Sequence, residues 1–477
     1  MSKNKVLSGL SWSFAEKLLT DLVNTVITIV LARLLMPEDY GLVALVTIFI
    51  NISLIFVSTG LGTAVIQNKD ADDEQIATIF YVNLILGILI YIVLFFCAPL
   101  IASSKGNTEL VALVRVLGLR IPITSVYNIQ HAHIKKRMEF KKFFYSSFLG
   151  TVLAGAVGIS MAYMGYGAWA LVFSTLTDSV VDSVVLFFTT KWLPKPALKI
   201  KKSMKMIDFG LKILVKEFIS RTYTQVRGLI IGYKYTAADL AYNTKGQKFP
   251  QMFNEIVDST VIRVMLPVLS EQQDEKHKMQ ETVKVSYRMF MFVVAPIMIG
   301  LIATADRFIP LLLTNNWIDC VPFLQAYCVV YLLYPISKMD ERAIEACGMG
   351  GTLIKKQVLT TTFSVVCIVI STVCFDSAIY LIFGLIVSTL FETIVTVNLS
   401  SKIIGYSFLE HIYDVRKTIA VSAVMGVAVY FIGLLPLSDL LALLAQIFAG
   451  VILYAALSIL AKDESALLLL NLLKGKK

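Results

Sequence analysis

The sequence contains fourteen apolar stretches, each long enough to cross a lipid bilayer as a helix. About 20 residues of α-helix span the ~30 Å hydrocarbon core of a membrane. Charged residues, Pro, Gly or Asn bound each stretch, and all the connections are short, so no attached soluble domain is expected. The expected spans are 8–34, 41–66, 77–103, 109–134, 142–165, 167–191, 207–233, 246–269, 282–305, 318–340, 352–375, 379–402, 417–435 and 439–461.

The composition agrees with this pattern. Hydrophobic residues make up 57% of the 477 residues, charged residues 16%, and the mean hydropathy is +0.75. A water-soluble domain carries roughly 25% charged residues, so this chain has too few charges to cover a soluble surface. A soluble enzyme, a disordered chain and a nucleic-acid-binding protein are therefore excluded. The predicted fold class is an all-α polytopic membrane protein with about fourteen transmembrane helices.

The cysteines and the N-terminus add little. The six cysteines form no CxxC pair, so neither a disulfide framework nor a metal site is expected, and no cofactor is predicted. The apolar run that begins at Val6 is far longer than the hydrophobic core of a signal peptide. It predicts an uncleaved first span.

The distribution of positive charge predicts the orientation of the spans. With the N-terminus in the cytoplasm, the cytoplasmic segments hold 29 of the 43 Lys and Arg and the external segments hold five. Cytoplasmic loops are enriched in Lys and Arg, so both termini are expected inside. The remaining nine lie within the spans, where function is most to be expected.

Two short segments that precede the basic stretch after span six have counterparts in the sequence that follows it. Residues 37–42 (PEDYGL) align with residues 237–242 (AADLAY) at an offset of 200, and residues 121–124 (IPIT) align with residues 334–337 (YPIS), which together make a weak internal echo. Repeated halves are typical of transporters, whose substrate path runs between them. The expected organisation is an N-lobe at 1–192, a basic cytoplasmic linker at 193–206, a C-lobe at 207–403, and a C-terminal helix pair with a basic tail at 404–477.

Several of these residues also resemble a known family. Residues 32–41 (ARLLMPEDYG) and 60–62 (GLG) are similar to the ARLL.PEDFG and GLG motifs of polysaccharide flippases. These Wzx-type exporters belong to the multidrug/oligosaccharidyl-lipid/polysaccharide (MOP) exporter superfamily. Further family motifs follow in the expected order, at 208–210 (DFG), 230–232 (IIG), 241–243 (AYN) and 266–270 (LPVLS). The resemblance therefore covers nearly the whole chain.

The resemblance implies a fold and a function. The fold would be a V-shaped pair of six-helix lobes with two extra C-terminal helices. The function would be to move a polyprenyl-diphosphate oligosaccharide from the inner to the outer leaflet for surface polysaccharide synthesis. Residues 236–241 lack the Gly and Pro that many members have there, so the turn between spans seven and eight stays open.

Ionisable residues inside the spans predict a polar cavity. On span seven Lys212, Lys216 and Arg227 share one helical face, with Arg221 beside it. Side chains of this kind pair well with phosphate, Arg through a planar bidentate fork and Lys as a point charge. The residues predicted to bind the substrate diphosphate are Arg120, Lys212, Lys216, Arg221, Arg227 and Lys248.

The carboxylates within the spans have two interpretations. One of them could carry a coupling proton or cation; the candidates are Asp21, Asp178, Asp182, Glu255, Asp258 and Glu392. Alternatively they are structural partners of nearby cations, such as Asp21 with Lys17 or Glu217 with Lys212, since pairing also removes the penalty of a buried charge. The energy source stays open between a proton, a sodium and a voltage gradient.

Other functions are compatible with parts of this pattern. A multidrug antiporter of the same superfamily would favour a cavity rich in carboxylates and aromatic residues. A membrane polysaccharide polymerase or glycosyltransferase would need longer external loops than this chain has. A peptidoglycan-precursor flippase would share the architecture. The expected partners are the lipid-linked oligosaccharide, membrane lipids and a polysaccharide polymerase, and no nucleic acid.

Overall fold

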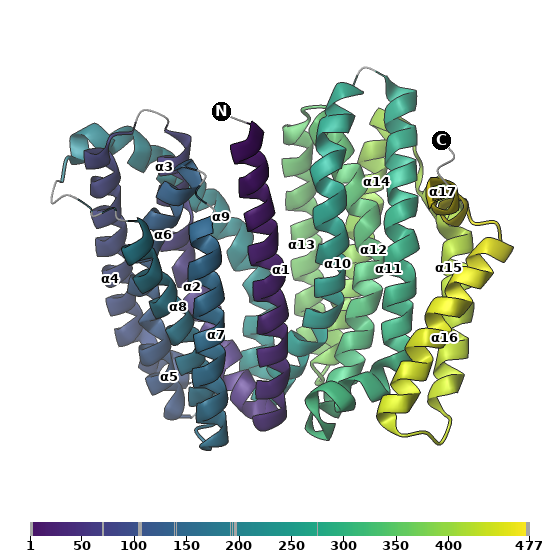
Figure 1. Ribbon diagram of the computed structural model, residues 1–477, viewed down its shortest axis with the longest axis horizontal. Helices are drawn as coiled ribbons and strands as arrows, with labels where there is room; N and C mark the ends of the chain where they lie inside the picture. The colour runs from purple at the N-terminus through teal and green to yellow at the C-terminus, as the bar shows by residue number, and fades with distance from the viewer. Residues whose placement is uncertain are drawn as a thin grey trace. The chain divides into compact units, whose positions relative to one another are not determined.

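The computed structural model describes residues 3–68, 71–103, 107–137, 139, 141–190, 192, 194, 198–273 and 275–473. This part of the chain is helical and has no strand (Figure 1). The helices are α1 (Lys3–Leu34), α2 (Pro37–Ser58), α3 (Gly60–Gln67), α4 (Asp73–Ser103), α5 (Glu109–Gly118), α6 (Arg120–Arg137), α7 (Lys141–Tyr163), α8 (Ala168–Thr190), α9 (Ile200–Lys234), α10 (Ala237–Glu271), α11 (Lys276–Leu313), the 3₁₀ helix η1 (Asn315–Cys320), α12 (Val321–Ala346), α13 (Gly350–Cys374), α14 (Ile379–Ile404), α15 (Phe408–Gly433), α16 (Asp439–Leu460) and α17 (Glu464–Leu473).

The long helices coincide with the expected spans. Among the described residues, eleven helical segments are long and apolar enough to cross a membrane. Helices α1, α9 and α10 lie at the expected first, seventh and eighth spans. The second and fourth spans are each interrupted once, between α2 and α3 and between α5 and α6. The chain is therefore a multi-pass, all-α membrane protein.

Helix α9 begins earlier than the sequence analysis expects, at Ile200 within the predicted linker. Two ion pairs hold its first turn against the start of α4. The ammonium of Lys199 lies 2.5 Å from a carboxylate oxygen of Glu74, and Lys202 pairs with Asp72. The hydrogen bond from Lys202 holds the pKa of the Asp72 carboxyl below its ordinary value. The basic stretch is thus bound to the protein at this point.

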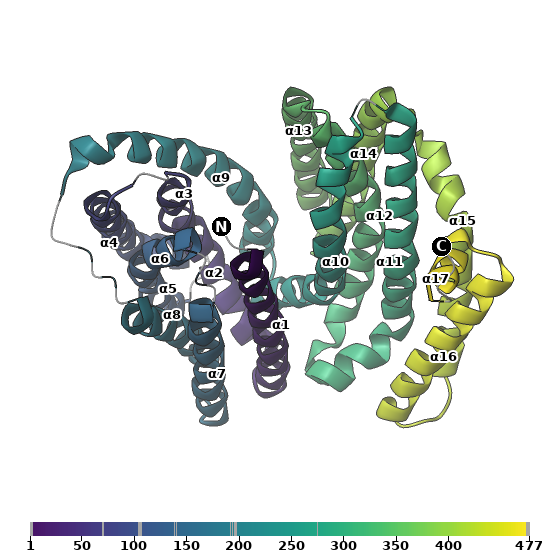
Figure 2. The same cartoon turned by 45° about the horizontal axis from the view of Figure 1, so that its top comes forward.

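The described chain packs as two compact units, Met1–Ala241 and Tyr242–Lys477. In the first unit α7 packs against α1 and α8, α6 packs against α4 and α8, and α9 follows a curved path along α2, α3 and α4 (Figure 2). The lobe boundaries expected from the repeat stay a prediction.

Close backbone approaches in the first unit explain two of the sequence motifs. A Cβ atom added to Gly60 would lie 2.0 Å from the carbonyl oxygen of Gly210, so the GLG and DFG motifs meet where α3 contacts α9. A Cβ atom on Gly41 would lie 1.8 Å from the carbonyl oxygen of Ala237. Only glycine permits such contacts without moving the backbone.

The repeated segments also begin their helices in the same way. The Asp39 carboxylate accepts a hydrogen bond from the backbone N–H of Met36 at 3.1 Å, and Asp239 accepts one from Thr236 at 3.0 Å. Both aspartates occupy the third helical position, where a carboxylate satisfies a free backbone donor and interacts favourably with the helix dipole. The similarity between residues 37–42 and residues 237–242 therefore reflects the same helix cap at the start of α2 and of α10.

In the second unit, α11 is the central helix. It packs against α12, α15 and α16. Helix α14 packs against both α12 and α13. The outer faces of these helices expose large apolar side chains; Phe448 and Val451 on α16 are 66% and 65% exposed. A surface of this kind suits contact with lipid, since soluble monomers rarely expose such large apolar patches.

Candidate functional site: polar clusters among the membrane helices

The first unit contains a polar cluster between α6 and α8. The guanidinium Nε of Arg120 donates a hydrogen bond to Ser179 Oγ at 3.2 Å, and Arg120 and Asp182 both interact electrostatically with Asp178. Gly150 on α7 leaves room for this carboxylate, because a Cβ atom there would lie 3.0 Å from Asp178 Oδ1. The cluster thus brings together three residues that the sequence analysis selects, Arg120, Asp178 and Asp182.

A histidine extends this cluster along the same two helices. The ring Nε2 of His131 lies 3.1 Å from Asp182 Oδ2, and the two side chains are 23% and 14% exposed. The imidazole also contacts the rings of Tyr127 and Phe143, with centroids 5.2 and 4.6 Å away. This half-buried pair joins α6 to α8 through one polar contact.

The cations of α9 differ in their surroundings. Lys212 is paired with Asp208 at 2.6 Å, and Arg221 Nε donates to Glu217 at 2.9 Å. Each carboxylate lies four residues before its cation, on the same helical face. The side chains of Lys212 and Arg221 remain 73% and 55% exposed, and Arg227 is half-buried. The side chain of Lys216 lies outside the described residues.

These pairs change one detail of the sequence interpretation. The sequence analysis suggests Glu217 as a partner of Lys212, but Glu217 accepts a hydrogen bond from Arg221, and Lys212 donates to Asp208 instead. Local carboxylates therefore accompany two of the span-seven cations.

On α1, Asp21 is exposed. Its predicted coupling role stays a prediction.

Helix α10 carries three of the predicted residues within the second unit. Lys248 and Glu255 are exposed, and Glu255 accepts a hydrogen bond from Gln251 at 2.7 Å. Asp258 is half-buried and interacts electrostatically with Lys338 and with other charges of α12.

A buried lysine forms the centre of a second cluster, between α12, α13 and α14. The Lys356 side chain is 1% exposed, and its ammonium contacts Glu341 and lies 2.7 Å from Glu392 Oε1. Glu341 also binds Lys338 at 2.9 Å. Of these four residues the sequence analysis selects only Glu392 as a site residue, because hydropathy places Lys338 and Lys356 at the ends of spans.

A third polar network attaches α15 to the rest of the second unit. Asp340 and His411 are both fully buried, with His411 Nε2 3.3 Å from Asp340 Oδ2. Asp340 also accepts a hydrogen bond from Ser400 Oγ at 2.9 Å, and the centroids of the Tyr406 and His411 rings lie 3.8 Å apart with the rings tilted by 33°. The sequence analysis misses this network. Its members lie on three helices far apart in the chain.

Comparison with known proteins identifies a family that this chain matches. A family model described as polysaccharide biosynthesis protein matches residues 30–322. The chain is 22% identical over 319 residues to the succinoglycan biosynthesis transport protein ExoT of Rhizobium meliloti (strain 1021), a match that covers 67% of this chain and 65% of that protein. It is 24% identical over 450 residues to the lipopolysaccharide biosynthesis protein WzxC of Escherichia coli (strain K12), covering 89% and 88%.

The fold also has a solved counterpart. A structure of the lipid II flippase MurJ in an inward closed conformation superposes with a TM-score of 0.74 at 13% identity, covering 95% of this chain and 99% of that chain. The resemblance to polysaccharide flippases that residues 32–41 and 60–62 indicate is confirmed. Since the family model matches more than half of its length, the chain belongs to the polysaccharide biosynthesis protein family.

Proposed function

We propose that this protein is a flippase that moves a polyprenyl-diphosphate-linked oligosaccharide across the bacterial cytoplasmic membrane for surface polysaccharide synthesis. The relatives' names concern transport and polysaccharide biosynthesis, which supports a transporter and not an enzyme. Both termini would lie in the cytoplasm, following the excess of Lys and Arg in the segments on that side. A polymerase would take up the delivered oligosaccharide.

The observation that carries the proposal is the exposure of cations on α9. Arg221 lies near the middle of this 35-residue helix, and its side chain is 55% exposed although Glu217 pairs with it. A charged side chain in a membrane span avoids lipid and faces a water-filled path or a bundle interior. The exposed cations Lys212 and Arg221 along such a path suit an anionic diphosphate better than an organic cation.

The proposed roles follow from these cations. Arg221 and Arg227 would hold the diphosphate, with Lys212, Lys216, Arg120 and Lys248 around its path. The carboxylates Asp208 and Glu217 would keep the anion from binding too tightly. We keep Asp178 and Asp182 as candidates for carrying a coupling proton, because His131 lies beside Asp182 and Asp182 interacts with Asp178. Asp21, Glu255 and Asp258 stay further candidates for a proton or cation. Glu392 is a weaker candidate, since it already binds Lys356.

Proteoliposomes test the proposal. They would contain a short fluorescent polyprenyl-diphosphate oligosaccharide, and the measured quantity is the rate at which label becomes accessible to a membrane-impermeant quencher. We expect the protein to accelerate this rate, and Arg221→Gln with Arg227→Gln to reduce it by at least about tenfold per arginine, since a charge-assisted hydrogen bond contributes ~1.5–3 kcal/mol.

A matched control replaces Lys355, an exposed lysine of α13, by Gln and should leave the rate unchanged. Two results would contradict the proposal. One is flipping that persists in the double arginine variant. The other is the absence of flipping under imposed proton, sodium and voltage gradients together with gradient-driven efflux of a cationic dye, which would indicate a drug antiporter.

A further inference from the structure

Helix α17 differs from the other helices of its unit in direction. In Figures 1 and 2, α15 and α16 run along the unit, whereas α17 crosses them near the beginning of α15. It packs on α11 and α16, and it exposes Leu467 and Leu468 by 39% and 41%. A short helix with a leucine-rich exposed face that crosses the spanning helices is typical of a segment in the membrane interface.

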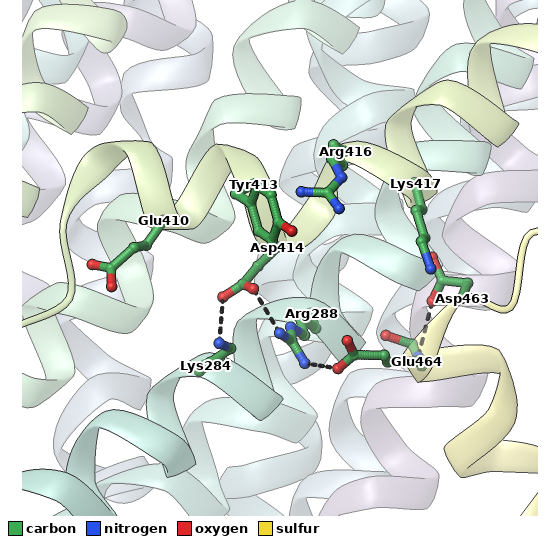
Figure 3. Close-up of a pocket in the computed structure, with 10 residues that line it drawn as sticks. Lys284, Arg288, Glu410, Tyr413, Asp414, Arg416, Lys417, Asp463 and Glu464 are labelled. Carbon is green, nitrogen blue, oxygen red and sulfur yellow. Dashed lines mark hydrogen bonds and ion pairs between the residues drawn. The ribbon is translucent and has the colours of Figure 1, made fainter.

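A charged pocket of about 420 Å³ lies between α11, α15 and α17 (Figure 3). This volume is within the ~300–1,000 Å³ of small-molecule sites. Basic and acidic side chains line it in equal number. The basic residues are Lys284, Arg288, Arg416 and Lys417, the acidic residues are Glu410, Asp414, Asp463 and Glu464, and Tyr413 and Ser465 complete the lining. The balance of charge alone does not decide what the pocket binds, so the partners of each group matter.

The acidic groups all have partners within the protein. Asp414 binds Arg288 at 2.6 Å and Lys284 at 3.3 Å. Glu464 also pairs with Arg288. Asp463 accepts a hydrogen bond from Thr418, and Glu410 accepts one from Ser407, both at 2.7 Å. These bonds use two of the four basic side chains, Lys284 and Arg288.

The other two basic groups are arranged differently. The Arg416 guanidinium stacks on the Tyr413 ring, 3.3 Å from its centroid, and Lys417 Nζ donates to the carbonyl oxygen of Lys462 at 3.1 Å. Both side chains are exposed, and within the described part of the chain neither forms an ion pair with a carboxylate. Figure 3 shows them side by side on α15 above the internal ion pairs. They leave positive charge available to an anion.

We propose that this pocket binds the phosphate headgroup of an anionic membrane lipid between Arg416 and Lys417. Guanidinium and ammonium groups are the usual protein ligands of phosphate, and adjacent basic residues at a membrane surface attract anionic lipids. The acyl chains have an apolar surface beside the site, since Leu409, Ile412 and Tyr413 at the start of α15 are 76%, 47% and 64% exposed. None of the residues that line the pocket is assigned to the proposed substrate path.

Native mass spectrometry of the delipidated, detergent-solubilised protein tests this site. The protein is titrated with phosphatidylglycerol, with phosphatidylcholine of the same acyl chains, and with glycerol phosphate, which has the phosphate but no chains. We expect phosphatidylglycerol to bind at least about tenfold more tightly than either of the others. Replacing both Arg416 and Lys417 by Gln should weaken its binding about 25-fold, fivefold for each charge at ~1 kcal/mol.

Lys402→Gln is the matched control, because Lys402 is exposed at the end of α14, outside the pocket, and should leave affinity unchanged. Equal affinity for the two lipids, or an unaltered double variant, would overturn the proposal. Tight binding of glycerol phosphate would indicate a soluble phosphate ester instead. If the double variant does not fold, hydrogen exchange in the wild type decides: phosphatidylglycerol should slow exchange in α17, and unchanged exchange refutes the site.

Discussion

Replacing Lys356 by Met removes the positive charge that joins α12, α13 and α14. Methionine has a similar length and fills the same apolar space, so the change is mainly one of charge. It leaves Glu341 and Glu392 close together, without the ammonium that contacts both. We expect a loss of stability, although the substitution makes the helix more hydrophobic.

The structure sets the size of the loss. Removing one partner of a buried ion pair costs ~3–5 kcal/mol. Lys356 is 1% exposed, but Glu341 is 20% and Glu392 38% exposed, and solvent screens part of the effect. Glu341 also keeps Lys338, 2.9 Å away. We therefore expect a decrease of about 3 kcal/mol in the free energy of unfolding.

Reversible unfolding in mixed dodecyl maltoside and sodium dodecyl sulfate micelles measures this quantity. Neutralising Glu392 in the same chain, as Lys356→Met with Glu392→Gln, should recover all but ~1 kcal/mol, because the unpaired carboxylate is then absent. Lys355→Met, at an exposed neighbouring position, should remain within ~0.5 kcal/mol of the wild type. A Lys356→Met variant as stable as the wild type, or a double variant no better than the single one, would refute this reasoning.

Three further changes have defined expected results. Gly41→Ala should destabilise the first unit by ~1–3 kcal/mol, because the new Cβ atom would overlap the carbonyl oxygen of Ala237, and a thermal melt should show the loss. At pH values above 5, Asp72→Asn should cause a small decrease in the melting temperature. The difference from the wild type should vanish as acid protonates Asp72 below its lowered pKa, since Lys202 stabilises only the charged form. Ser407→Ala should cost ~1 kcal/mol through loss of the α15 cap, measured in the same micelle unfolding assay.

Hydropathy predicts most of the fold because each span must satisfy the same physical requirement. A helix that crosses lipid needs about 20 apolar residues whatever its neighbours are, so span positions can be read locally. The start of α9 at Ile200 is the clearest difference. There the basic residues are held by Asp72 and Glu74, which are more than 120 positions away in the chain.

The candidate site is less predictable because its contacts are not local. The spacing of four residues between Glu217 and Arg221 could be read from the sequence, and the structure pairs them. By contrast, no local pattern connects His131 to Asp182 or Lys356 to Glu392. Helical periodicity identifies the face on which a charge lies. It does not identify which other helix presents the partner.

The position of Lys356 also bears on how the protein is made. Helices leave the ribosome in order, and an unpaired lysine within a new span opposes insertion into lipid. Glu341, the first of its partners, lies on α12, which is synthesised before α13, whereas Glu392 lies on α14 and follows later. A carboxylate is thus already available when α13 enters the membrane, and the ion pair between Lys356 and Glu341 can form before α14 completes the cluster.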